Sequence, residues 1–61
     1  MSYIPFDDSA YKNGTLVYAK AAPSQILTVM SYYRRIYYCM INKEPHKKFL
    51  AYFEGEIVPL S

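Results

Sequence analysis

A chain of 61 residues with a single cysteine must hold its fold without an internal disulfide bond. Domains this small bury a small share of their surface, and most gain support from disulfides, a metal ion or a partner subunit. The sequence offers Cys39 no second cysteine and only one histidine, too few ligands for a structural zinc site. We therefore expect one domain spanning residues 1–61, without metal or cofactor. It gains support from a protein partner or from self-association, with a homodimer as the first expectation.

The composition favours an exposed aromatic surface. Hydrophobic residues make up 52% of the chain and eight residues are tyrosine, which is more aromatic area than so small a core encloses. The net charge of +2 is too low to indicate nucleic-acid binding by itself. The start of the chain lacks the basic and apolar regions of a secretory signal, and Arg34 and Arg35 interrupt the longest apolar stretch. These features predict a cytoplasmic protein, in the host cytoplasm if the source is viral, with no membrane contact.

The segment before residue 21 has a β pattern. Asn13-Gly14 is the dipeptide preferred in two-residue hairpin turns, because both residues tolerate positive φ. It predicts a hairpin with strands at residues 9–12 and 15–20. A short helical turn from Asp7 to Gly14 is the alternative, since Asp caps the start of helices and Gly commonly follows their end.

Residues 22–43 are predicted to form the one helix of the chain. Pro23 suits the first helical position, and Pro45 marks the end of the helix. Apolar residues recur in this segment at spacings of three and four, which places them on one face of a helix. That core face comprises Ile26, Met30, Tyr33, Tyr37 and Met40 or Ile41, flanked by Leu27, Val29 and Ile36.

Residues 48–60 are again β-like, because their side chains alternate between two faces. Gly55 predicts a turn or bulge, after which residues 56–58 return as a short strand. Pro59 restricts that strand to a sheet edge. The predicted fold is therefore α+β: a β-hairpin, a central helix packed on an antiparallel sheet, and a second β-hairpin.

The face of the predicted helix opposite the core contains aromatic and guanidinium groups. Tyrosine and arginine are enriched at interface hot spots, because each combines a large contact area with directional hydrogen bonds. We expect four residues to bind a partner: Tyr32, Arg34, Arg35 and Tyr38. The alternative is that these tyrosines lay their rings on neighbouring apolar surface, with the arginines only improving solubility.

A basic cluster follows the predicted helix and is a weak candidate for anion binding. It comprises Lys43, His46, Lys47 and Lys48, which could join Arg34 or Arg35 in one positive patch. Lysines with stacking tyrosines hold single-stranded nucleic acid or a nucleotide in many proteins. Basic groups near a helix C-terminus also stabilise the helix dipole, which explains the cluster without any ligand.

No catalytic residues are predicted. A nucleophilic pair would need Cys39 or a serine beside His46, and a Cys in the middle of a helix is commonly a small packing residue. The carboxylates have no diagnostic spacing and no glycine-rich phosphate loop exists. The carboxylates are Asp7, Asp8, Glu44, Glu54 and Glu56.

We therefore expect a small non-enzymatic interaction protein that binds and inhibits or regulates another macromolecule. Compact chains of this kind are typical of phage or mobile-element accessory proteins that act on a host enzyme or defence system. The alternative is a nucleic-acid or nucleotide binder that uses its Tyr, Arg and Lys surface.

Overall fold

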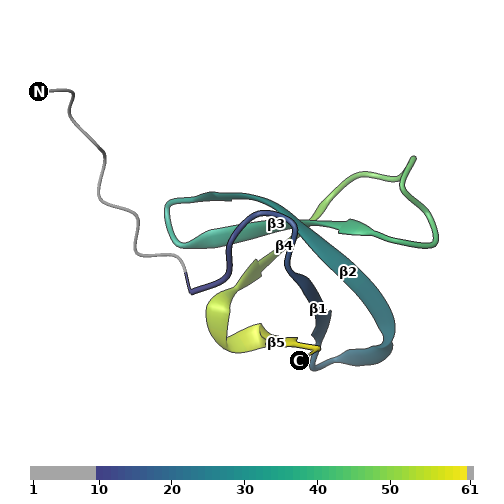
Figure 1. The fold of residues 1–61 in the computed structure, drawn as a ribbon, viewed down its shortest axis with the longest axis horizontal. Helices are drawn as coiled ribbons and strands as arrows, with labels where there is room; N and C mark the ends of the chain where they lie inside the picture. Colours follow the sequence, from purple (N-terminus) through teal and green to yellow (C-terminus); the bar gives the residue numbers. More distant parts are fainter. Residues whose placement is uncertain (1–9, 61) are drawn as a thin grey trace, which may run out of the picture.

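The computed structural model describes residues 10–60, which form a five-stranded antiparallel sheet and one 3-10 turn. The sheet order is β4-β3-β2-β1-β5, so that the last strand returns to lie beside the first (Figure 1). The elements are β1 (Leu16–Ala19), β2 (Ala22–Tyr33), β3 (Ile36–Ile41), β4 (Leu50–Phe53), the 3-10 turn η1 (Glu54–Glu56) and β5 (Ile57–Pro59).

The predicted α+β fold is wrong, because residues 22–43 contain two strands and no helix. β2 and β3 form a hairpin whose two-residue turn is Arg34-Arg35. This segment is rich in β-branched and aromatic residues, which fit the pleated surface of a sheet better than a helix. Among residues 10–60 the structure contains no α-helix, so there is no central helix on the sheet.

The sheet curls around its core because β2 takes part in two sides of the fold. β1 pairs along the first part of β2 and β5 pairs with β1, while β3 pairs along the second part of β2 and β4 pairs with β3. Met30 is an extra residue between Val29 and Ser31 in the β2–β3 ladder, and a bulge of this kind increases local twist and bend. Figure 1 shows β3 in the upper part of the fold, with β1 and β5 below it.

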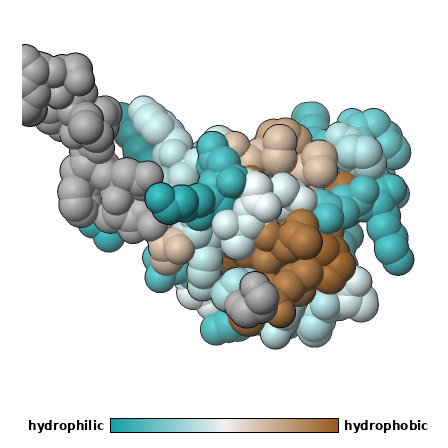
Figure 2. All heavy atoms as spheres, in the orientation of Figure 1, coloured by the Kyte–Doolittle hydropathy of each residue, from teal (hydrophilic) through white to brown (hydrophobic). Residues whose placement is uncertain are grey.

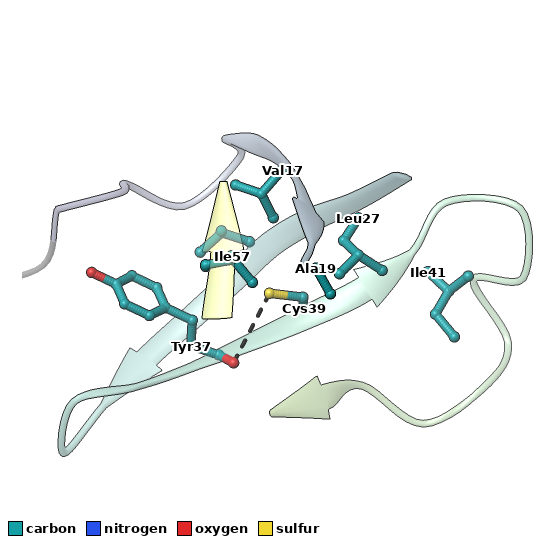
Figure 3. Packing of buried hydrophobic residues seen from close by; sticks show 8 residues of the cluster. Val17, Ala19, Leu27, Tyr37, Cys39, Ile41 and Ile57 are labelled. Carbon is teal, nitrogen blue, oxygen red and sulfur yellow. Dashed lines mark hydrogen bonds between the residues drawn. The ribbon is translucent and has the colours of Figure 1, made fainter. Parts of the chain in front are cut away.

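The core lies between these two sides (Figure 3) and consists of side chains that alternate along the strands. Its members are Val17, Ala19, Leu27, Val29, Tyr37, Cys39, Ile41 and Ile57. Tyr37 is fully buried, and its hydroxyl oxygen accepts a hydrogen bond of 2.7 Å from the backbone N–H of Ala10. The rings of Tyr11 and Tyr32 lie 5.6 and 4.6 Å from the Tyr37 ring, between centroids. Three tyrosines therefore close one end of the core.

The predicted core face is wrong for two residues and right for two others. Tyr37 and Ile41 are buried, whereas Met30 is 39% exposed and Tyr33 is 61% exposed. The reason is the period: side chains alternate between the two faces of a strand, so a spacing of four keeps a residue on the same face, as for Tyr37 and Ile41, whereas a spacing of three changes the face. Met30 is in addition the extra residue of the β2–β3 ladder, and Tyr33 lies on the other strand of the hairpin from Tyr37.

The N-terminal prediction is confirmed in part. The strand expected at residues 15–20 is present as β1, but it pairs with β2 and β5 instead of residues 9–12. Residues 10–12 form no strand, and residues 10–14 form no helical turn, while Asp7, Asp8 and Ser9 lie outside the described residues.

The C-terminal prediction is closer to the structure. β4 alternates as expected, with Leu50 and Tyr52 packed against the core. Gly55 lies in η1, and the returning strand β5 pairs with β1 instead of β4. β5 is an edge strand that contains Pro59, as expected.

Candidate functional surface

The outer face of the sheet carries no charged side chain. None of the five described strands contains Asp, Glu, Lys, Arg or His, so every charged group of residues 10–60 lies in a turn, a loop or η1. An antiparallel sheet with one buried face ordinarily turns polar residues outward. Here the outward residues are mainly aromatic or aliphatic, and they form two surfaces.

The first, which we call the aromatic surface, covers the end of β2, the start of β3 and the end of β4. It comprises Tyr33, Ile36, Tyr38 and Phe53 with the adjacent Arg34. Ile36 pairs with Tyr33 on one side and Phe53 on the other, so these side chains share one row on one face. Tyr33 and Phe53 are 61% and 60% exposed, the largest exposures among the bulky hydrophobic residues described.

Arg34 and Arg35 form the turn at one end of this surface. Their φ angles are 52° and 69°, in the left-handed region that suits Asn-Gly far better than two arginines. A side chain with a Cβ in this region costs about 1 kcal/mol per residue. The Arg34 guanidinium carbon lies 5.3 Å from the centroid of the Tyr33 ring, at cation–π distance.

The structure brings together three of the four predicted partner-binding residues and separates the fourth. Arg34, Arg35 and Tyr38 lie at or beside the aromatic surface. Tyr32 lies on the core side, where its ring packs on Tyr37. The sequence prediction missed Tyr33, which it assigned to the core. One signal in the sequence could have placed Tyr33 correctly. Tyr33 and Ile36 directly flank the arginine pair, so their side chains pair across the strands if that pair is a hairpin turn.

The basic cluster lies in the loop between β3 and β4, at the opposite end of β3 from the arginine turn (Figure 1). The six residues of β3 span about 20 Å at ~3.3 Å per residue, well beyond the screening length of about 8 Å at physiological salt. Lys43, His46, Lys47 and Lys48 therefore do not form one patch with Arg34 or Arg35. Within the loop, Lys47 Nζ lies 3.1 Å from Glu44 Oε2, so this cation already has an anionic partner.

The second surface, which we call the aliphatic surface, covers β1, β5 and the first part of β2. It comprises Leu16, Tyr18, Ile26, Val58 and Leu60. Tyr18 pairs with Ile26 and Val58 across three strands, and the Leu60 N–H donates to the Leu16 carbonyl, which aligns a second row. Figure 2 shows a strongly hydrophobic area in this region, bordered by polar residues.

An open hollow of about 390 Å³ lies between the first part of β2 and the loop after β3. Polar and charged groups of both signs line it beside two isoleucines, with no convergent set of groups for one ligand. The lining residues are Ser24, Gln25, Ile26, Ile41, Lys43 and Glu44.

Cys39 and His46 do not form a reactive pair. Cys39 is buried in the core, where its thiol donates to the Tyr37 carbonyl over 3.9 Å, and His46 is exposed in the β3–β4 loop. Burial raises the pKa of the Cys39 thiol above its ordinary value of 9.0, because the thiolate loses hydration there. The thiol is therefore protonated and unreactive at neutral pH.

Residues 10–60 contain no cluster of three or more His, Cys, Asp or Glu side chains that could hold a metal ion. In the same part of the chain, no helix has the length and apolar character needed to cross a membrane. No family model, curated protein or solved structure matches the chain.

Proposed function

We propose that this chain is a binding module that docks a protein partner on its aromatic surface. The observation that supports this proposal is a sheet with two apolar faces, one of which is buried in the core while the other bears exposed aromatic rings and no charge. Exposed apolar area that is concentrated on one face marks interaction sites in small domains.

The residue types of the aromatic surface favour a protein as the partner. Tyrosine and arginine are the residues that contribute most at protein interfaces, and Phe53 adds apolar area beside them. The cross-strand pairs hold these side chains on a rigid hairpin, which lowers the entropy lost on binding. Inhibition or regulation of the partner, as in phage accessory proteins, and a cytoplasmic location stay predictions.

The nucleic-acid alternative has less support. A single-stranded nucleic acid is held by a continuous positive groove with several phosphate contacts. Here the arginine turn and the basic loop lie at opposite ends of β3, and Glu54 and Glu56 follow directly after Phe53. A polyanion that crossed the aromatic surface would meet these carboxylates.

A capture experiment with matched variants tests the proposal. Tagged wild-type protein is used to recover partners from native cells, beside Phe53→Ala and Phe49→Ala. Phe49 is the matched control, because it is 46% exposed but lies in the loop outside the aromatic surface. We expect the wild type and Phe49→Ala to recover one stoichiometric protein. Phe53→Ala should reduce its recovery at least tenfold, which corresponds to a loss of about 1.4 kcal/mol in binding free energy.

Two outcomes contradict the proposal. Equal recovery by the two phenylalanine variants would place the binding site elsewhere on the molecule. Recovery of nucleic acid that dissociates steeply as salt rises would favour the alternative function, because phosphate contacts release counterions.

A further inference from the structure

The Arg34-Arg35 turn uses residues that are poorly suited to its backbone. Both φ angles are positive, and two-residue hairpin turns with this geometry favour Asn-Gly. The same chain has Asn13-Gly14 elsewhere, with Gly14 at φ 95°. Turn stability therefore does not explain the arginine pair, and residues kept in strained conformations cluster at binding sites.

The turn places a permanent positive charge at the border of the aromatic surface. Arg34 is exposed, and its guanidinium lies over the Tyr33 ring at 5.3 Å. The planar set of donors on a guanidinium matches a carboxylate through two parallel hydrogen bonds.

We propose that the arginine turn recognises a carboxylate on the protein partner, so that the partner segment is acidic and carries an aromatic or aliphatic residue beside the acid. This inference rests on the proposed function of the aromatic surface. The apolar residue of the segment packs between Tyr38 and Phe53, while its carboxylate lies against Arg34.

The charges around the surface favour an acidic protein segment over nucleic acid. One cationic turn at one end of the surface suits a single local carboxylate. The carboxylates of Glu54 and Glu56 follow directly after Phe53, so a chain with a phosphate at every unit would meet repulsion there. Ile36, next to Arg35, pairs with Phe53, so Glu54 and Glu56 lie at the same end of the surface as the arginine turn, one strand further along. A protein segment can present one acid to Arg34 and uncharged residues to the rest of the surface.

The test separates binding from turn stability. The variant Arg34→Asn with Arg35→Gly supplies the residues that the backbone favours, so we expect a Tm equal to or above that of the wild type. The variant Arg34→Lys with Arg35→Lys keeps the charge and the strained turn but lacks the planar donor set. Loss of binding in the Asn-Gly variant at an equal or higher Tm shows that the arginines act in binding and not in folding, and the binding that the lysine pair retains shows what is left without the planar donor set.

The probe is a fluorescent twelve-residue peptide with one acid beside two apolar residues, Gly-Ser-Gly-Ser-Asp-Phe-Leu-Ser-Gly-Ser-Gly-Ser, with binding followed by anisotropy. Control peptides replace the Asp by Lys, or replace Phe and Leu by Ser. We expect the acidic apolar peptide to bind at least about tenfold more tightly than either control. We expect the Asn-Gly variant to lose about tenfold in affinity, and the lysine pair to retain part of the binding.

Equal binding of the acidic and basic peptides, or unchanged binding by the Asn-Gly variant, would overturn the inference. So would tighter binding of a twelve-nucleotide oligothymidylate than of the acidic apolar peptide. The capture experiment distinguishes a failure of this inference from a failure of the proposed function. If Phe53→Ala abolishes capture of the cellular partner while the Asn-Gly variant captures it normally, the docking surface stands and carboxylate recognition falls.

Discussion

Tyr37 connects the core to the segment before β1 at the scale of single residues. Its ring is fully buried, while its hydroxyl oxygen accepts the hydrogen bond from Ala10 N–H. We expect Tyr37→Phe to lower the free energy of unfolding by about 0.5–1.5 kcal/mol, because the N–H loses its acceptor. Tyr38→Phe is the matched control on the outer face, for which we expect no change. Urea unfolding measures both, and equal losses would contradict this role of the Tyr37 hydroxyl.

Cys39 makes the stability of the fold fall as the pH rises through the alkaline range. Burial raises the pKa of its thiol, so the unfolded chain releases the proton at a lower pH than the folded chain. The contribution of Cys39 to stability is therefore complete below the ordinary thiol pKa of 9.0 and is lost as the pH rises above it. We expect the urea midpoint to fall between neutral pH and pH ~10, and to fall less in Cys39→Ala. An equal decline in the two proteins would assign the pH dependence to other groups.

The two glycines provide a matched test at the scale of turns. Gly14 has φ 95°, and its N–H donates to the Val29 carbonyl over 2.7 Å, which joins the segment before β1 to β2. A Cβ at either glycine would meet no heavy atom within 4 Å, so the backbone alone decides the effect. We expect Gly14→Ala to destabilise the fold by about 1 kcal/mol. Gly55→Ala, at a residue without positive φ, is expected to be neutral or stabilising by up to about 1 kcal/mol. Thermal unfolding that reverses this order would contradict the role of the left-handed conformation.

The strands that sequence reasoning found are those bounded by ordinary turn residues. β1 follows Asn13-Gly14, and β4 ends before Gly55, so both were recognised near their true positions. β2 and β3 were read as one helix because the turn between them contains neither Gly nor Asn. Without a visible turn, a segment of 22 residues is too long for a strand of ordinary length.

The composition of the outer face is a second reason why the sequence pattern did not predict β2 and β3 as strands. A strand is recognised when polar and apolar residues alternate, but the outward residues of β2 and β3 are themselves mainly apolar or aromatic. With apolar residues on both faces, spacings of three and four occur as readily as spacings of two. Arg34, Arg35 and Tyr38 were identified as candidates by residue type, whereas Tyr33 and Phe53 could be placed beside them only once the strand pairing was known.

At the scale of the whole molecule, both edges of the sheet resist the addition of another strand. In β5 the ladder to β1 uses the Glu56 carbonyl and the Leu60 N–H, so the alternation of the ladder turns Pro59 toward the free edge, where it offers no N–H. In β4 the Phe53 N–H donates to the Glu56 carboxylate over 2.8 Å. Association through an edge is therefore disfavoured, and the outer face remains as the route by which two molecules meet.

The aliphatic surface is the part of that face suited to a second copy of the chain. It is uncharged, so a twofold arrangement brings no like charges together, and interfaces between identical subunits are more apolar than others. We expect sedimentation velocity to show a dimer that dissociates on dilution and that is lost in Leu16→Lys, which places two buried ammonium groups across the twofold axis. Phe49→Lys is the matched control, since Leu16 and Phe49 are 45% and 46% exposed and only Leu16 lies on the aliphatic surface. A wild-type monomer at every concentration, or equal dissociation of the two lysine variants, would contradict self-association through this surface.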